Sequence, residues 1–129
     1  MTRPTPPIEL DASSERLSLA TSLPDGFVER LAACCPVVTE PAMVADSSRD
    51  WWPLGIRWAI DGAVAQRAAV VARPVDTAQV QSVLQCCDDA GVAVTPAGWR
   101  SSVVGGAAPV CGGVLLDLSA LQGVDRKST

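Results

Sequence analysis

The groups best suited to binding chemistry gather in one glycine-rich stretch, residues 96–113. Its first part supplies Gly98, Arg100, Ser101 and Ser102 in close succession. Glycine lets backbone N–H groups converge on an anion, and a guanidinium beside hydroxyls adds charge-assisted hydrogen bonds. The pattern predicts a cradle for a phosphate group. The alternative interpretation is a structural loop whose glycines only make turns.

Better-known phosphate motifs do not fit this stretch. The glycines do not follow the G-x-G-x-x-G spacing of dinucleotide-binding turns, and the G-K-[ST] ending of a P-loop is absent. The chain has no histidine and no tyrosine, so the commonest general base and a common acid are both missing. We therefore expect binding from these residues and predict no catalytic residue and no metal ligand.

Three short apolar runs predict the strands that position this loop. The first is residues 68–72, which are followed and stopped by Arg73-Pro74. The second is residues 92–95, directly before the loop, and the third is residues 114–118, directly after it. The third predicted strand has no following strand to cover it. Because an uncovered strand edge templates pairing, we expect the isolated chain to be poorly stable or to self-associate.

A helix is predicted between the first two strands. Asp76 is a suitable N-cap with Gln79 as its capping-box partner, and Gly91 is a suitable C-terminal cap. The residues expected on its apolar face recur at helical spacing, at Val80, Val83, Leu84, Cys87 and Ala90. Strand, helix and strand together form a β-α-β unit over residues 68–95.

The first part of the chain has weaker patterns. Residues 1–49 are expected to form a leader with one short helix, which begins near Pro24 and is stopped by Pro36. Residues 50–129 are expected to form the folded lobe. Its lead-in contains Trp51, Trp52 and Trp58. This segment is interpreted as an apolar latch against the domain's own core, the alternative being a binding surface.

Composition excludes several classes of function. A net charge of −4 without a basic cluster argues against nucleic acid and anionic membranes as partners. No stretch approaches the roughly 20 apolar residues of a membrane span, and residues 1–10 lack the apolar run of a secretory signal. A cytoplasmic location is expected. The cysteines, at 34, 35, 86, 87 and 111, form neither a disulfide framework nor a zinc motif, and are interpreted as small buried apolar residues.

The order of these elements resembles the FAD-linked oxidases. The resemblance is carried by residues 71–77 (V-A-R-P-V-D-T), the helix, residues 94–98 (V-T-P-A-G) and residues 114–119 (V-L-L-D-L-S). More narrowly, it is similar to the glycolate oxidase, D-lactate dehydrogenase and alkyldihydroxyacetonephosphate synthase branch. The tryptophan lead-in resembles that of proteins related to this synthase. The likeness covers roughly residues 50–124.

The resemblance implies an α+β fold, the first lobe of an FAD-binding domain of the vanillyl-alcohol oxidase or PCMH type, truncated before a second lobe and a substrate domain. It implies FAD as cofactor. The loop that binds its pyrophosphate in the family commonly has the sequence P-x-G-G-G-T-S or P-x-G-G-R-S-G. The cofactor-binding residues implied here are Pro96, Gly98, Trp99, Arg100, Ser101, Ser102, Gly105 and Gly106.

Trp99 departs from the family pattern because it stands where the second glycine would be. If the backbone there needs a positive φ, a bulky residue costs about 1–3 kcal/mol. The implied function is the FAD-binding part of a flavin-dependent oxidoreductase, acting on a 2-hydroxy acid or resembling the synthase. The alternative is a non-catalytic remnant or interaction module. The implied partners are FAD and either the missing C-terminal part or another protein chain.

Overall fold

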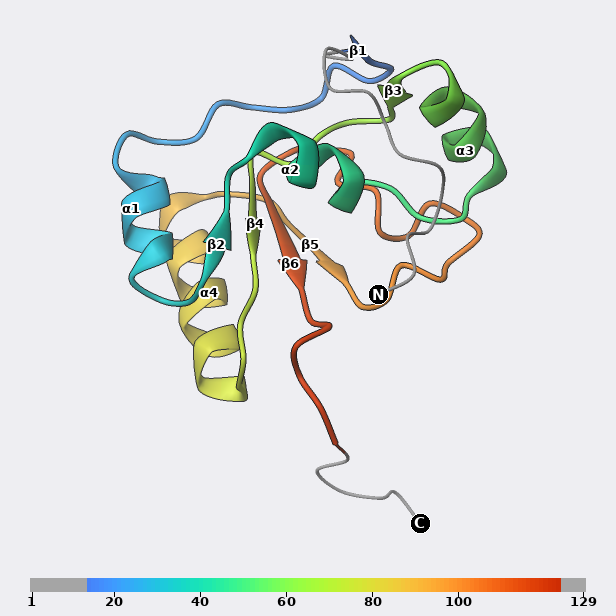
Figure 1. The fold of residues 1–129 in the computed structure, drawn as a ribbon. Coiled ribbons are helices and arrows are strands. Elements are labelled where there is room, and N and C mark those ends of the chain that lie inside the picture. The colour runs from blue at the N-terminus through green and yellow to red at the C-terminus, as the bar shows by residue number, and fades with distance from the viewer. Residues whose placement is uncertain (1–13, 124–129) are drawn as a thin grey trace.

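The computed structural model describes residues 14–123 (Figure 1). Residues 1–13 and 124–129 lie outside the described residues, and the predicted lack of a secretory signal falls in the first of these ranges. The strands are β1 (Ser14–Glu15), β2 (Val37–Val38), β3 (Ala63–Val64), β4 (Val70–Ala72), β5 (Val94–Ala97) and β6 (Val114–Asp117). The helices are α1 (Phe27–Ala32), α2 (Pro41–Ser47), α3 (Pro53–Ile60) and α4 (Thr77–Ala90). No helix among the described residues is long and apolar enough to cross a membrane.

The main sheet has the strand order β2-β4-β6-β5. Strands β4, β6 and β5 are parallel, and β2 is antiparallel to β4. All three predicted strands are therefore present, but β6 lies in the middle of the sheet. The expectation that the third strand is uncovered was wrong, because β4 pairs with one side of β6 and β5 with the other. Among the described residues, β2 and β5 are the edges of this sheet.

Helix α4 confirms the predicted caps at Asp76 and Gly91, but the Gln79 side chain bonds to Val75 and not to the Asp76 N–H of a capping box. The Asp76 carboxylate accepts a hydrogen bond from the Gln79 N–H at 2.8 Å, and the Gln79 side chain accepts one from the Val75 N–H at 2.9 Å. Gly91 ends the helix in the left-handed conformation with φ of 65°. Most of the predicted apolar face packs inward, with Val83 and Cys87 fully buried. Leu84 is the exception, because 45% of its side chain is exposed.

Side chains that alternate along the strands form a core on each face of the sheet. Val70 and Leu116 point to the face covered by α1 and α4, while Val71 and Leu115 point to the other face. Val44 of α2 covers this second face together with apolar residues of the glycine-rich loop. Each face is therefore closed by a different part of the chain, and the loop is one of the two covers.

The segment expected to be a leader supplies part of the first core. Phe27 and Leu31 of α1 are fully buried against the sheet, and β2 is one of its strands. Helices α2 and α3 were not predicted. Each begins with a proline at its first turn, where the missing N–H costs nothing, and Glu40 caps α2 by accepting from two backbone N–H groups.

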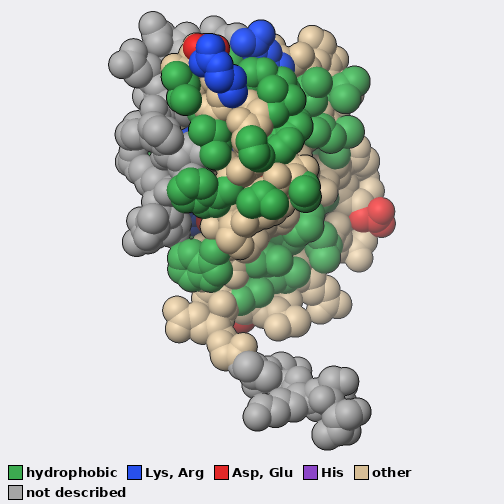
Figure 2. Space-filling model, turned by 90° about the vertical axis from the view of Figure 1, so that its right-hand side faces the viewer, with side chains coloured by type: hydrophobic (Ala, Val, Ile, Leu, Met, Phe, Trp, Pro, Cys, Tyr) green, Lys and Arg blue, Asp and Glu red, His purple; other side chains and the backbone are tan. Residues whose placement is uncertain are grey.

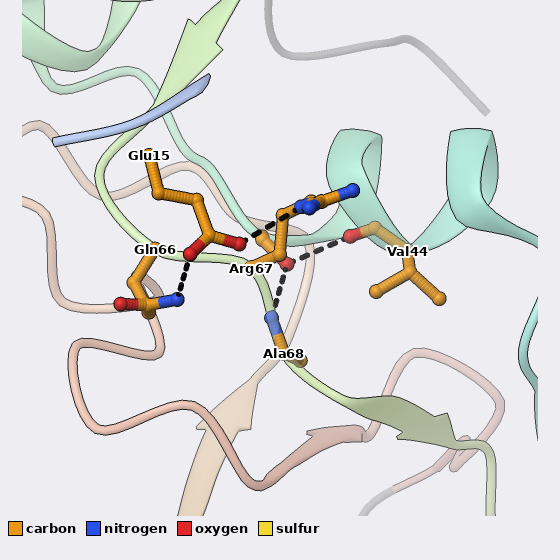
Figure 3. Close-up of polar contacts among 6 residues, drawn as sticks. Glu15, Val44, Gln66, Arg67 and Ala68 are labelled. Carbon is orange, nitrogen blue, oxygen red and sulfur yellow. Dashed lines mark hydrogen bonds and ion pairs between the residues drawn. The ribbon is translucent and has the colours of Figure 1, made fainter. Parts of the chain in front are cut away.

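A polar network ties the short β1–β3 pair and α2 to the start of β4 (Figure 3). The Glu15 carboxylate accepts from Gln66 Nε2 at 2.6 Å and from Arg67 Nε at 2.9 Å. Ser48, after the end of α2, donates to the Val44 carbonyl at 2.7 Å and accepts from the Ala68 N–H at 3.0 Å. These bonds join segments that lie far apart in the sequence and anchor the chain just before it enters the sheet.

Candidate functional site

The glycine-rich loop runs from the end of β5 back to the start of β6, along the second face of the sheet (Figure 1). It surrounds a hollow of about 230 Å³. The hollow is lined by Pro96, Ala97, Gly98, Trp99, Arg100, Ser101, Ser102, Gly106 and Ala107. The structure thus brings together every predicted cofactor-binding residue except Gly105. Ala97 and Ala107 were not predicted, since small apolar residues carry no chemical signal in a sequence.

Arg100 is the one described residue other than glycine whose backbone is left-handed, with φ of 55°. The condition raised for Trp99, a positive φ, is therefore not met there, because the unusual conformation falls one residue later. Such a conformation costs a residue with a side chain on the order of 1 kcal/mol or more. Arg100 is also only 7% exposed. A buried cation held in an unfavourable backbone conformation is typical of a functional position.

The backbone near Arg100 is open to a ligand at Gly98 and more restricted at Gly106. A Cβ added to Gly98 would meet no heavy atom within 4 Å, so a ligand can approach this backbone closely. A Cβ on Gly106 would lie 3.4 Å from the Ser102 hydroxyl, and that hydroxyl accepts from the Val104 N–H at 3.3 Å. The Trp99 side chain is 64% exposed. The rim of the hollow is therefore open at Gly98 and bulky at Trp99.

Gly105 packs away from the hollow against the tryptophan lead-in. A Cβ on Gly105 would stand 3.0 Å from Cε3 of Trp52, and its φ is 78°, so space and conformation both require glycine. Trp52 also meets Trp58 edge to face, with ring centroids 5.4 Å apart. Trp52 thus packs against the loop and against Trp58, outside both core clusters of the sheet, whereas 44% of Trp51 is exposed.

Asp50 joins the lead-in to the loop and was missed as a site residue. It is 2% exposed, and its carboxylate accepts from the Trp52 N–H at 2.9 Å. The other carboxylate oxygen lies 3.5 Å from the Ala107 N–H, at the far end of the loop. An acidic residue directly before an aromatic pair was the available signal, but nothing in the sequence linked it to position 107.

Asp117 lies at the carboxyl end of β6, at the same edge of the sheet at which the loop leaves β5. It is 1% exposed and pairs with Arg73 Nε at 3.2 Å. Its second oxygen accepts from the Ser119 N–H at 3.0 Å. This carboxylate is therefore fully engaged in tying the end of β4 to the turn after β6.

Four cysteines gather where α1 meets α4, and all are free thiols. Cys35 and Cys87 are buried, while Cys34 and Cys86 are half-buried. Burial, together with a smaller effect of its neighbours Cys86, Cys34 and Cys35, raises the pKa of the Cys87 thiol to about 11. Burial likewise raises the pKa of Cys35 and of Cys86. These thiols are therefore weak nucleophiles. The prediction of small buried apolar residues is confirmed for Cys35 and Cys87, whereas Cys111 is exposed.

The sequence of the β4-to-β6 segment has known relatives. Residues 68–128 match the profile of a family described as FAD binding domain. This segment is therefore similar to that FAD binding domain family. The cofactor of the family is FAD.

The chain spans less than a quarter of the length of the proteins that it matches. A D-lactate dehydrogenase of Anaerostipes hadrus is 33% identical over 65 residues, which are 48% of this chain and 14% of that protein. The fold matches a solved alkyldihydroxyacetonephosphate synthase with a TM-score of 0.74 at 17% identity, over 95% of this chain and 24% of that one. It matches p-cresol methylhydroxylase with a TM-score of 0.58 at 16% identity, over 84% of this chain and 21% of that one. The fold is thus the α+β first lobe of a PCMH-type FAD-binding domain.

Proposed function

We propose that the loop of residues 96–106 holds the pyrophosphate of FAD. The observation that carries this proposal is the hollow around Arg100, where a buried guanidinium lies beside open backbone at Gly98. Backbone N–H groups and an arginine are the donors that bind phosphate oxygens in the bidentate and converging geometries that phosphate prefers. Ser101 and Ser102 supply hydroxyls on the same wall.

The size of the hollow fits a part of the cofactor. Sites for whole small molecules span roughly 300–1,000 Å³, whereas this one measures about 230 Å³. The described residues are therefore suited to the diphosphate end of FAD, and the affinity for ADP and for FAD should be similar. When bound, the flavin supplies hydride-transfer chemistry. The residues of this chain bind and orient the nucleotide.

For the protein as a whole we propose a flavin-dependent oxidoreductase or a synthase-like flavoprotein. The relative named D-lactate dehydrogenase supports a 2-hydroxy acid as substrate, and the fold match to a synthase supports the second activity. A cytoplasmic location accompanies this proposal, since five free cysteines suit a reducing compartment.

A second candidate function is protein interaction. Figure 2 shows the side of the molecule that is turned to the right in Figure 1, where hydrophobic side chains gather and charged ones lie mainly at the margin. The tip of the glycine-rich loop exposes Trp99, Val103 and Val104, with exposed fractions of 64%, 61% and 77%. Exposed apolar side chains close together mark contact surfaces. Another protein chain, or a further part of the flavin domain, would bury them.

Calorimetric titration with ADP and with FAD tests the first proposal. We expect weak binding of both, and Arg100→Ala should lower the affinity for either at least about tenfold, because a charge-assisted bond contributes roughly 1.5–3 kcal/mol. Arg57→Ala is the matched control, since Arg57 lies on α3 and pairs with the exposed Asp61. No binding of either nucleotide by the wild-type chain would reject the proposal and favour the interaction module.

A further inference from the structure

The segment Asp50–Trp52, here named the brace, contacts the glycine-rich loop at three separate places. The Trp51 N–H donates to the Ser102 carbonyl at 3.0 Å. The Trp52 ring lies against Gly105, and the Asp50 carboxylate reaches the Ala107 N–H. None of the three brace residues lines the hollow. The brace therefore supports the loop from the side that a ligand does not touch.

The loop needs this support because it has little structure of its own. Between β5 and residue 104 it contains no helix or strand. The backbone bonds within its later part are single-turn bonds, such as Ala108 N–H to the Gly105 carbonyl at 3.0 Å. Glycine-rich backbone loses much conformational freedom when it is ordered. A loop that is ordered before the ligand arrives avoids that cost at the moment of binding.

We propose that Trp52 is a positioning residue for the nucleotide loop, with Asp50 as its anchor. The indole fixes Gly105 while the Asp50 carboxylate fixes Trp52 through its backbone N–H, and the hydrogen bond from the Trp51 N–H to the Ser102 carbonyl holds the earlier part of the loop. The inference rests on the proposed function, since it concerns the same loop. It assigns part of the nucleotide affinity to a residue outside the site.

The test compares three variants of the full chain in their affinity for ADP, measured well below their melting temperatures. Trp52→Ala should weaken ADP binding roughly tenfold, because the loop must then be ordered on binding. Trp52→Phe should stay within about threefold of wild type, because a planar ring can still cover Gly105. Trp51→Ala is the matched control: its side chain is partly exposed, and the bond to Ser102 comes from its backbone.

Hydrogen exchange of the amides of residues 98–107 supplies a readout that general destabilisation would not reproduce. Trp52→Ala should speed exchange in this loop while the amides of β4 and β6 keep their wild-type protection. If Trp52→Ala does not fold, Gly105→Ala replaces it, because the added Cβ would press on the same ring at 3.0 Å.

The outcomes separate the two proposals. If the wild-type chain binds ADP and Trp52→Ala or Gly105→Ala binds it equally well, the positioning role is overturned and the nucleotide site still stands. Equal loss in Trp51→Ala and Trp52→Ala also overturns it. Absence of ADP binding by the wild-type chain overturns both proposals, whatever the exchange rates show.

Discussion

A methyl group on Gly113 would stand 2.2 Å from the carbonyl oxygen of Ala93. The two residues meet where β5 and β6 begin to pair, and the Val114 N–H donates to the same carbonyl at 2.9 Å. Gly113 also has φ of 68°. The return of the loop into β6 therefore requires glycine for two independent reasons, close approach of two backbones and a left-handed conformation.

Gly113→Ala and Gly91→Ala separate these two reasons. Gly91 is also left-handed, with φ of 65°, but a Cβ there would meet nothing within 4 Å. We expect Gly91→Ala to lower the free energy of unfolding by about 1–2 kcal/mol. Gly113→Ala should cost clearly more, because strand pairing must also shift. Urea unfolding measures both, and equal losses would show that the clash is relieved at no cost.

Pro96 protects the edge of the sheet. The Leu118 N–H donates to the Ala97 carbonyl, and the Val114 N–H donates to the Ala93 carbonyl, so positions 93 and 97 face β6. Because backbone direction alternates along a strand, position 96 faces away from β6, toward the open edge of the sheet. Proline has no N–H to offer there, and edge strands are commonly blunted in this way. We therefore expect the wild-type chain not to associate through this edge.

Pro96→Val should promote self-association by restoring the outward N–H. Sedimentation at increasing protein concentration should show a rising average mass for this variant. Thr95→Val is the matched control, since it adds apolar area to the same strand without changing its outward donors. A wild-type chain that associates as strongly as Pro96→Val would contradict the protective role of the proline.

The sequence predicted what local chemistry determines. Helix α4 has its N-cap at Asp76 and its C-cap at Gly91, and both are recognisable without knowledge of the rest of the chain. The placement of β6 between β4 and β5 was not predictable, because strand pairing joins residues that lie far apart in the sequence. The same holds for Phe27 and Leu31, whose burial depends on the packing of α1 against the sheet.

The candidate site, too, could be predicted from the sequence only in part. The lining of the hollow was predicted because Gly98, Arg100 and the serines follow one another in the chain. The family pattern drew attention to the backbone at Trp99, whereas the structure has the left-handed residue at Arg100. Single backbone angles depend on how a loop is held at both ends, and here a distant carboxylate, Asp50, takes part in holding it.

The Cys87 thiol makes stability depend on pH in the alkaline range. Burial raises its pKa from 9.0 to about 11 in the folded chain. Between these values the unfolded chain has lost the proton and the folded chain retains it. The free energy of unfolding must therefore fall as pH rises from about 9 to 11, by up to about 1.4 kcal/mol per pH unit for this one group.

Cys87→Ala should flatten this dependence, although the smaller side chain lowers stability at every pH. Urea unfolding between pH 8 and roughly pH 11 measures the slope. Cys111→Ala removes an exposed thiol and should leave the slope at its wild-type value. Identical slopes for Cys87→Ala and wild type would mean that the buried thiol does not control the alkaline limit.

Trp99→Gly should weaken nucleotide binding slightly. Trp99 does not have a left-handed backbone, so glycine relieves no strain there. With 64% of its side chain exposed, Trp99 also contributes little to the core. What remains is the added freedom of the unbound loop, which costs roughly 0.5–1 kcal/mol. That cost corresponds to a loss of about two- to fivefold in affinity for ADP, measurable by calorimetric titration.

Trp99→Ala distinguishes backbone freedom from side-chain contact. Alanine removes the indole but leaves the backbone more restricted than glycine does, so Trp99→Ala should bind ADP almost as well as wild type. A loss well beyond fivefold in both variants would instead show that the indole stacks on the nucleotide, since an aromatic contact would be lost in each. Tighter binding by Trp99→Gly than by wild type would restore the strain explanation at position 99 and argue that the loop changes conformation when the nucleotide binds.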